Sequence, residues 1–338
     1  MHPIRNVLLI RLKSMGDILF TCPAVRAVRE AFPAGRISFL VSREYASLLE
    51  GFPDVNEVIA LDRAPYHSGN PKAIIMETLS LLRHLRREKF DLAVDFQGYG
   101  ETALLAWCSG ARQRWGPSRT AGRRWSYTRA VMRNDRVHPI EWNLSFLHHC
   151  GLRPGKITNE FALPEDALAE ARRLFTGLGL DPAKPTLFIQ PLTSSPLKNW
   201  PLANYLEVAR HWRNRGLQIL FGGGPSERAV LEPVREAGFP VSAGAPLLVA
   251  GGLLKLSTLV LGSDTGLLHL AVALGKRVVM IMASAKPGRC HPFQHADWTV
   301  TPAVGGVVSS IEAGRVIEAC AQALAEMGPA SKSNIQSR

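Results

Sequence analysis

Four residues suited to binding a phosphate group lie together at one predicted turn. The segment LVLGSDTGLLHLAVALGKRVVMIM, residues 259–282, reads as strand, turn, apolar helix and strand, with Asp264, Thr265, Gly266 and His269 at the turn. A helix N-terminus at the carboxyl end of a buried strand presents free backbone N–H groups and the positive end of the helix dipole to an anion. Asp264 alone would suit a helix cap and His269 a core position, but the four together favour a site for a phosphorylated ligand.

A second polar cluster follows the strand predicted in PTLFIQP. In the segment QPLTSSPLKNWP, residues 190–201, the hydroxyl residues Thr193, Ser194 and Ser195 precede an isolated cation, Lys198. A lone lysine is most simply a surface residue, whereas a lysine beside three hydroxyls at a strand carboxyl end is suited to hold a phosphate. Its charge would offset the negative charge that grows on a diphosphate leaving group.

A glycine-rich turn, FGGGPSERAV, follows the next predicted strand and includes Gly223 and Glu227. The G-x-G-x-x-G spacing is absent and no Walker lysine follows, which argues against hydride transfer and P-loop chemistry. Glu227 suits contact with a ribose hydroxyl, and it equally suits the first turn of a helix, where a carboxylate favours the dipole. The chain has no Asp-x-Asp motif, so we expect no metal ion, with phosphate charge met by Lys198 and the helix end of the opening segment.

The N-terminal half offers one carboxylate in a comparable place. In RLKSMGDILFTC, a buried strand ends at Ile10 and a loop over residues 11–17 leads to a helix predicted from about residue 18 to residue 31. Asp17 suits a helix N-cap, and it equally suits a general base that takes the proton of a sugar hydroxyl, with Lys13 nearby to bind an anionic ligand. The sequence leaves both interpretations of Asp17 open.

An arginine-rich segment, residues 111–136, indicates a surface that faces an anion. It holds eight arginines against one acidic residue, with Trp115, Trp125 and Tyr127 between them. The whole chain carries a net charge of +12, so we expect an anionic partner such as a phosphorylated substrate, a membrane lipid or nucleic acid. The arginines that we take as candidate contacts are Arg112, Arg114, Arg119 and Arg123.

Alternating strand and helix patterns must position these groups. Apolar runs such as NVLLI, RISFLVS, TLFIQ and LQILF alternate with helical patterns in both halves of the chain. This order predicts an α/β protein of two doubly wound domains that face each other across a cleft, where ligands collect at strand carboxyl ends. We place the domains at residues 1–160 and 161–327, with the option that the last helix packs back on the first domain, and a disordered tail at residues 328–338.

The apolar runs, the N-terminus and the cysteines are typical of a cytoplasmic protein. No apolar run among the 338 residues reaches the roughly 20 needed to span a bilayer, and the N-terminus does not resemble a signal peptide. The five cysteines are scattered and never spaced Cys-x-x-Cys, which argues against a disulfide framework and a zinc site. We expect a cytoplasmic protein.

Several of these segments resemble the signature segments of one enzyme family. LLIRLKSMGDILFTCPAVRAVREAFP, PLKNWP, GGGPSE and GSDTGLLHLAVALGKRVV look like those of glycosyltransferase family 9, the ADP-heptose:lipopolysaccharide heptosyltransferases, and they occur in the same order. Two segments depart from the pattern. Gln190-Pro191-Leu192 stands where the family commonly has a His-Pro-Gly type strand exit, and SAKPGRCHPF follows Met282 where a glycine-containing turn is usual.

The resemblance implies a GT-B fold, with an acceptor-binding N-terminal domain and a donor-binding C-terminal domain. It implies inverting, metal-independent transfer of heptose from ADP-heptose to a hydroxyl of the lipopolysaccharide inner core, without a cofactor. By the same resemblance, Asp17 matches the general base, Lys198 contacts the donor phosphate, and the 264–269 turn binds the donor. The arginine-rich segment would face an anionic lipid-linked glycan, and peripheral contact of the protein with the inner leaflet of the inner membrane would then be an option.

Two alternatives stay open. The first is a transferase of the same fold that uses another nucleotide sugar. The second is a non-catalytic basic protein that binds glycans or nucleic acid, which the charge and the arginine-rich segment motivate. We do not expect a nucleic-acid partner, because the sequence contains no recognised nucleic-acid-binding motif.

Overall fold

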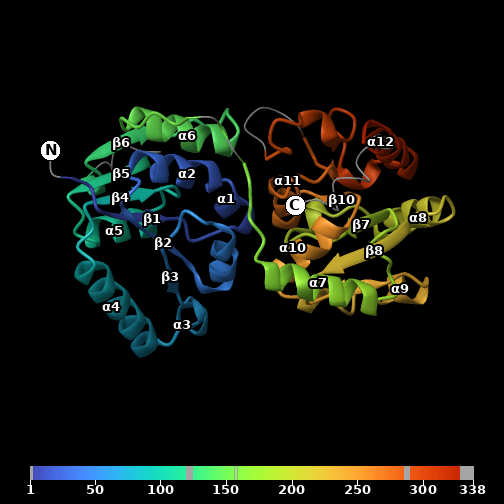
Figure 1. Cartoon of the computed structure of the whole chain (residues 1–338), viewed down its shortest axis with the longest axis horizontal. Coiled ribbons are helices and arrows are strands. Elements are labelled where there is room, and N and C mark those ends of the chain that lie inside the picture. Colours follow the sequence, from blue (N-terminus) through green and yellow to red (C-terminus); the bar gives the residue numbers. More distant parts are fainter. Residues whose placement is uncertain (1–2, 119–124, 156, 158, 285–289, 328–338) are drawn as a thin grey trace. The chain divides into compact units, whose positions relative to one another are not determined.

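The chain forms two compact units, unit 1 (Met1–Ala162) and unit 2 (Leu163–Arg338), shown in Figure 1. The computed structural model describes residues 3–118, 125–155, 157, 159–284 and 290–327. Each unit contains its own sheet and its own hydrophobic core. The tail predicted at residues 328–338 lies outside the described residues.

Six parallel strands form the sheet of unit 1, in the order β3-β2-β1-β4-β5-β6. The central strands carry nearly continuous buried side chains, as expected of parallel strands that are covered on both faces. The strands are β1 (Asn6–Ile10), β2 (Arg36–Ser42), β3 (Glu57–Leu61), β4 (Leu92–Asp95), β5 (Gln113–Ser118) and β6 (Arg129–Met132).

The helices of unit 1 connect these strands and differ from the prediction at one point. They are α1 (Met15–Leu19), α2 (Cys22–Ala31), η1 (Arg43–Gly51), α3 (Ala64–Ser68), α4 (Pro71–Arg87), α5 (Gly100–Cys108) and α6 (Pro139–His149). The single helix predicted from about residue 18 is therefore two helices. Thr21 Oγ1 donates to the Ile18 carbonyl at 2.6 Å where α1 ends, and Pro23 occupies the start of α2, where its missing N–H is tolerated.

Unit 2 repeats the plan with a second parallel sheet, in the order β12-β11-β10-β7-β8-β9. Its strands are β7 (Thr186–Gln190), β8 (Gln218–Gly223), β9 (Val241–Ala243), β10 (Leu259–Ser263), β11 (Val278–Ile281) and β12 (Thr299–Val300). Its longer helices are α7 (Glu165–Gly177), α8 (Leu202–Arg213), α10 (Leu247–Leu256), α11 (Gly266–Ala273) and α12 (Ala313–Glu326). Its short helices are η3 (Pro196–Lys198), η4 (Pro225–Glu227), α9 (Glu232–Glu236), η5 (Ala296–Trp298) and η6 (Val308–Ser310).

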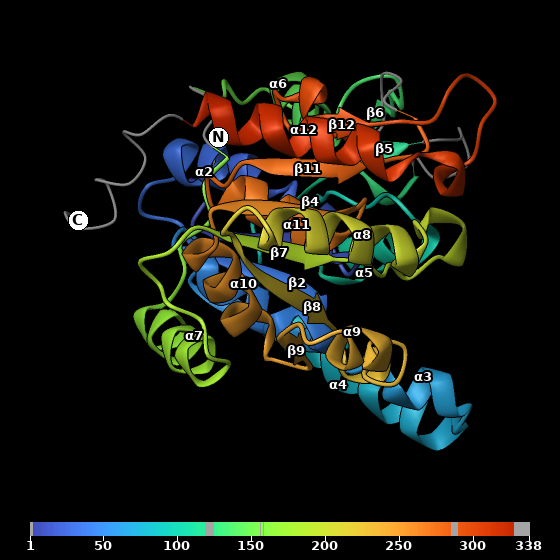
Figure 2. The same ribbon diagram turned by 90° about the vertical axis from the view of Figure 1, so that its right-hand side faces the viewer.

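Within unit 2, α12 packs against α8 and the β10–β12 strands, while α7 packs against α10 (Figure 2). The prediction of two doubly wound parallel α/β sheets is confirmed. Among the described residues, no helix combines the length and the apolar character needed to cross a membrane.

Candidate active site

The strand order of each sheet reverses between two central strands, β1 and β4 in unit 1 and β7 and β10 in unit 2. Loops on the two sides of such a point diverge, which leaves room for a ligand at the carboxyl ends of the strands. The segments that follow β1, β7 and β10 hold Asp17, Lys198 and Asp264, and the loop after β4 holds Gln97. The first three, which are sequence candidates, therefore fall where this topology binds ligands.

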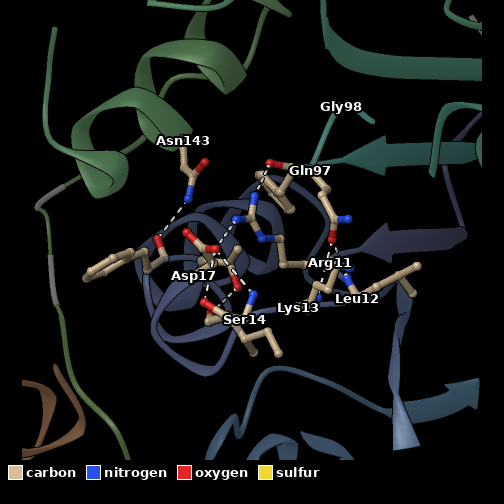
Figure 3. Close-up of polar contacts among 12 residues, drawn as sticks. Arg11, Leu12, Lys13, Ser14, Asp17, Gln97, Gly98 and Asn143 are labelled. Carbon is tan, nitrogen blue, oxygen red and sulfur yellow. Dashed lines mark hydrogen bonds and ion pairs between the residues drawn. The ribbon is translucent and has the colours of Figure 1, made fainter. Parts of the chain in front are cut away.

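Asp17 lies in the first turn of α1, and its two carboxylate oxygens are used unequally (Figure 3). Its Oδ2 lies 2.7 Å from an Nη of Arg11 and accepts from the Ser14 N–H at 3.2 Å and the Ser14 hydroxyl at 3.1 Å. Its Oδ1 forms no hydrogen bond to any described residue. Ser14 is the helix N-cap, so Asp17 is the third helical residue of a capping box rather than the cap itself.

Arg11 fixes the direction of the Asp17 carboxylate. Its guanidinium reaches Asp17 with one Nη and donates with the other to the Phe96 carbonyl at 2.8 Å, in the loop after β4. The two contacts point the planar guanidinium in one direction, as Figure 3 shows. A fixed cation on one oxygen leaves the other oxygen available to a substrate.

Gln97 and Asp95 stabilise the loop between β1 and α1 through hydrogen bonds. Gln97 Oε1 accepts from the N–H groups of Leu12 and Lys13, at 2.9 and 3.3 Å. Asp95 is fully buried, and it accepts from the Gln97 N–H at 2.8 Å and from the Tyr127 hydroxyl at 2.7 Å. Burial raises the pKa of Asp95, although the hydrogen bond from Tyr127 and those from the following loop oppose the rise.

The end of α1 is anchored as well. Asn143 on α6 is buried and donates through Nδ2 to the Phe20 carbonyl at 2.9 Å (Figure 3). Lys13, the predicted anion-binding residue, lies in the loop that leads into α1 and is exposed. The structure thus places Lys13 four residues before Asp17, in a short segment whose backbone is hydrogen-bonded at Leu12 and Lys13 and at Phe20.

The arginine-rich segment is used partly within the fold. Arg112 is exposed, whereas Arg114 donates to the carbonyls of Ser126 and Ala111 at 2.9 and 2.7 Å. The guanidinium of Arg129 lies over the Trp115 ring, 5.6 Å from its centroid. Two further candidates, Arg119 and Arg123, lie outside the described residues. Acceptor binding by the four candidate arginines stays a prediction.

In unit 2, Lys198 at the end of η3 and His269 on α11 meet the Asp264 carboxylate. Lys198 Nζ donates to Asp264 Oδ2 at 2.7 Å, and His269 Nε2 lies 3.1 Å from Oδ1. Burial alone would raise the pKa of Asp264, but the hydrogen bonds and charges of His269 and Lys198 outweigh it and lower that pKa to about 2. Asp264 is therefore a fixed anion that positions a lysine and a histidine.

The α11 helix begins beside this cluster. Thr265 is its N-cap, and its hydroxyl accepts from the Leu268 N–H at 3.4 Å, while Gly266 is the first helical residue. Gly262, at the end of β10, leaves no room for a side chain, because a Cβ there would lie 2.5 Å from the Gln190 carbonyl oxygen. This close approach of two strand ends sets the α11 N-terminus next to the β7 exit.

At the β7 exit, the hydroxyl residues mostly shape their own turn. Thr193 Oγ1 donates to the Ser195 carbonyl at 2.7 Å and accepts from the Ser195 N–H at 3.1 Å. Ser194 is exposed between them. A role of these three residues in donor binding stays a prediction, and Lys198 follows them directly on η3.

Glu227 takes part in a local cap. Its Oε2 accepts from the Gly224 N–H at 2.7 Å at the start of η4. A Cβ at Gly223 would lie 2.4 Å from the side chain of Leu231, so the turn requires glycine for packing. Contact of Glu227 or Gly223 with a ribose stays a prediction beside this structural role.

One group of described residues has metal-ligand character. Glu57, His84 and Glu88 place ligand atoms within 4.8 Å of one another. Arg36 pairs with both glutamates, at 3.2 and 3.1 Å, so its cation already offsets part of their charge. Glu57 begins β3, His84 lies on α4 and Glu88 is the C-cap of α4, so the group lies away from the carboxyl end of β1, which precedes Asp17.

Sequence reasoning did not identify Arg11, Gln97, Asp95 and Asn143. A signal existed for two of them, because DFQG directly follows a buried strand and strand exits of parallel sheets carry site residues. Arg11 opens the loop that holds Asp17, but an arginine at that position has no feature that separates it from a surface cation. Asn143 lies on a helix that is remote in sequence, and no local pattern marks it.

Comparison with protein families decides the class of the chain. Residues 78–303 match the model of glycosyltransferase family 9 (heptosyltransferase). The chain belongs to glycosyltransferase family 9. It is therefore a glycosyltransferase, as the sequence resemblance implied.

Individual relatives align with most of this chain. The chain is 23% identical to lipopolysaccharide core heptosyltransferase OpsX of Haemophilus influenzae over 88% of its own length and 84% of that protein. It is 27% identical to lipopolysaccharide heptosyltransferase 1 of Salmonella typhimurium over 84% of this chain and 90% of that protein.

Solved structures share the fold. A family 9 glycosyl transferase from Veillonella parvula superposes with a TM-score of 0.85 at 19% identity, over 95% of this chain and 98% of that one. ADP-heptose lps heptosyltransferase II of E. coli gives a TM-score of 0.78 at 20% identity, over 95% and 99%. The predicted GT-B fold is confirmed.

Proposed function

We propose that this glycosyltransferase moves heptose from ADP-heptose to a hydroxyl of the lipopolysaccharide inner core. Support comes from the lipopolysaccharide heptosyltransferases that resemble it along most of their length, and from the fold it shares with an E. coli heptosyltransferase solved with ADP (TM-score 0.77). The observation that carries the chemistry is the unequal use of the Asp17 oxygens.

In this proposal Asp17 is the general base of an inverting displacement. The acceptor hydroxyl approaches the open Oδ1, its oxygen forms a bond to the anomeric carbon, and the bond from that carbon to the diphosphate oxygen breaks. The hydroxyl proton passes to Asp17 and ADP carries away the bonding electron pair. Arg11 holds the carboxylate through the other oxygen, so the proton acceptor keeps its direction through the reaction.

The donor diphosphate would lie at Lys198 and the α11 N-terminus. Lys198 and the first free N–H groups of α11 supply positive charge where the leaving group becomes more negative. Asp264 orients both Lys198 and His269. Because this cationic group can meet the diphosphate charge, we propose that transfer needs neither a divalent metal ion nor a cofactor.

The division of labour follows from these positions. Unit 1 would bind the acceptor near Asp17, Lys13 and the arginine-rich segment, and unit 2 would bind the nucleotide sugar. The enzyme would act in the cytoplasm, in peripheral contact with the inner leaflet that carries its lipid-linked acceptor.

The test is mass-spectrometric detection of transfer from ADP-heptose, UDP-sugars and GDP-sugars to lipid A that carries inner-core sugars. We expect a heptose mass increment only with ADP-heptose, unchanged by EDTA, and an inverted anomeric configuration in the NMR spectrum of the product. Transfer only from a UDP- or GDP-sugar would show that the donor is not ADP-heptose, while the protein would still be a glycosyltransferase. Loss of activity in EDTA with recovery on adding Mg²⁺ would overturn metal independence, and no transfer from any donor would favour a glycan-binding protein.

A further inference from the structure

One surface of unit 1, which contains none of the proposed catalytic residues, combines exposed apolar and basic side chains. On α4, Ile75, Met76 and Leu79 face solvent, and Met76 is 71% exposed. The exposed basic residues of the same helix are Lys72, Arg83, Arg86 and Arg87. None of the exposed residues of α4 is acidic.

These positions form a single stripe along α4. At 3.6 residues per turn, residues 72, 75, 76, 79, 83, 86 and 87 fall on one side of the helix, and the buried Leu81 and Leu85 fall on the opposite side. The buried stripe is the one that the core of unit 1 requires. The outward stripe is therefore an additional amphipathic face, with apolar side chains in its first turns and cations at both ends.

The stripe continues onto α5. Arg86 Nε donates to the Cys108 carbonyl at 2.9 Å and so joins α4 to the end of α5. Leu104 and Trp107 on α5 are exposed, and the Trp107 ring meets the ring of Trp125 edge to face, with centroids 5.7 Å apart. Trp125 is itself 60% exposed. We name the exposed stripe of α4 together with Leu104, Trp107 and Trp125 the α4–α5 surface.

The chemistry of this surface suits the headgroup region of a bilayer. Helices whose outward faces combine apolar and Lys/Arg side chains lie in the membrane interface, with the apolar side chains at the acyl boundary and the cations on anionic headgroups. Tryptophan favours the same depth because its ring is amphipathic. A nucleic acid would satisfy the cations but leave the apolar side chains in water, and self-association through this face would bring like charges together.

We propose that the α4–α5 surface docks on the surface of a bilayer that contains anionic phospholipid. The inference deepens the proposed function, because an enzyme with a lipid-linked acceptor gains from residence on the membrane. Its physical basis is independent of catalysis, since it rests on exposure and charge alone. Docking through this surface would concentrate the enzyme in the layer that holds its acceptor.

The test is sedimentation of the full chain with vesicles of phosphatidylglycerol and phosphatidylethanolamine, without donor or acceptor. We expect binding that weakens with salt, and a loss of at least about tenfold in the partition coefficient for Met76→Glu. Val230→Glu, which places the same charge on an exposed apolar position of unit 2, should bind like the wild type. Arg83→Gln should lose about fivefold and its matched control Arg172→Gln, on α7, should lose little.

Three results would overturn the proposal. The first is that the wild type does not bind vesicles. The second is that Met76→Glu and Val230→Glu lose vesicle binding equally. The third is that the wild type sediments as a dimer that Met76→Glu dissociates, while neither protein binds vesicles. Thermal unfolding of each variant checks that the fold is intact. Transfer to detergent-dispersed acceptor separates the two proposals, because it should survive in Met76→Glu and would be absent in every variant if the proposed function were wrong.

Discussion

The two units share one strand order and each places an aspartate at the point where that order reverses, yet the two carboxylates are held in opposite ways. In Asp17 all three donors meet one oxygen, and the side chain is 36% exposed. In Asp264 both oxygens are engaged by a cation or a histidine, and the side chain is 18% exposed. A carboxylate with an open oxygen can accept a proton, whereas one with both oxygens engaged serves to position other groups. The same residue type at equivalent places in one topology thus supports two roles.

The strongest way to break this comparison is Asp17→Asn. We expect kcat to fall by about 10²- to 10⁴-fold because the amide cannot take the acceptor proton. The free energy of unfolding should change by less than about 1 kcal/mol, since the ion pair with Arg11 is partly exposed. Steady-state kinetics and denaturant unfolding measure the two effects, and turnover close to that of the wild type would remove Asp17 from the role of base.

The same substitution in unit 2, Asp264→Asn, should weaken donor binding instead. Lys198 and His269 lose the anion that orients them, so we expect donor kcat/KM to fall by up to about 10²-fold. Isothermal titration with ADP should show weaker binding in Asp264→Asn and unchanged binding in Asp17→Asn. Equal ADP affinity in both variants would mean that the unit 2 cluster does not hold the nucleotide.

The pH dependence of stability sharpens the contrast. The pKa of Asp264 is about 2 in the fold against 3.8 as its ordinary value. Ionised Asp264 therefore stabilises the fold by about 2 kcal/mol at pH values above 3.8. This stabilisation is lost as the pH falls through the folded-state pKa of about 2. Unfolding of wild type and Asp264→Asn in denaturant should therefore give a stability difference about 1 kcal/mol smaller near pH 3 than near pH 6. A difference that stays constant with pH would contradict the ion-pair account of Asp264.

Arg11→Lys tests whether the open oxygen of Asp17 depends on the arginine. A lysine cannot contact the Phe96 carbonyl and Asp17 in the fixed geometry of a guanidinium, so we expect kcat to fall by about tenfold while donor KM holds. The control is Arg26→Lys, which alters another arginine–aspartate pair of unit 1, formed with Asp54 at 2.6 Å. If both variants kept full turnover, Arg11 would be structural only.

The smallest expected effect concerns the hydrogen bond between Tyr127 and Asp95. Tyr127→Phe removes the hydroxyl that donates to buried Asp95, and we expect the free energy of unfolding to fall by about 1 kcal/mol. Tyr66→Phe is the matched control, because its hydroxyl bonds to Thr78 at an exposed position and its loss should cost under about 0.5 kcal/mol. Equal stability of the two variants would show that Asp95 finds another donor.

Much of the fold could be predicted from the sequence, because strand and helix periods differ and several strand exits carry polar residues. The strand β10 and the α11 turn are examples, since LVLGSDTG contains a buried strand, a cap and the start of an apolar helix in eight letters. The break between α1 and α2 was not predicted, because an apolar run continues through Leu19 and Phe20 and hides it. Apolar periodicity does not show the Thr21 hydrogen bond or the position of Pro23, which separate the two helices.

The candidate site, like the fold, could be predicted from the sequence only in part. Asp17, Lys198 and Asp264 could be singled out by type and place, but the way each is held depends on residues far away in sequence. The Asp17 carboxylate is oriented by Arg11 only because Phe96, on another strand exit, accepts from the same guanidinium. In the arginine-rich segment, residue type alone does not show that Arg114 and Arg129 have intramolecular partners, and acceptor binding by this segment stays a prediction.

Each unit is one uninterrupted stretch of chain, so the polypeptide passes between them once, at residues 162 and 163. A single genetic crossover near that point exchanges a whole unit and leaves both hydrophobic cores uncut. Recombination at this point can therefore exchange one unit for its counterpart from a related chain without dividing a sheet. Chimeras joined at the same junction would test which unit selects the sugar donor and which selects the acceptor.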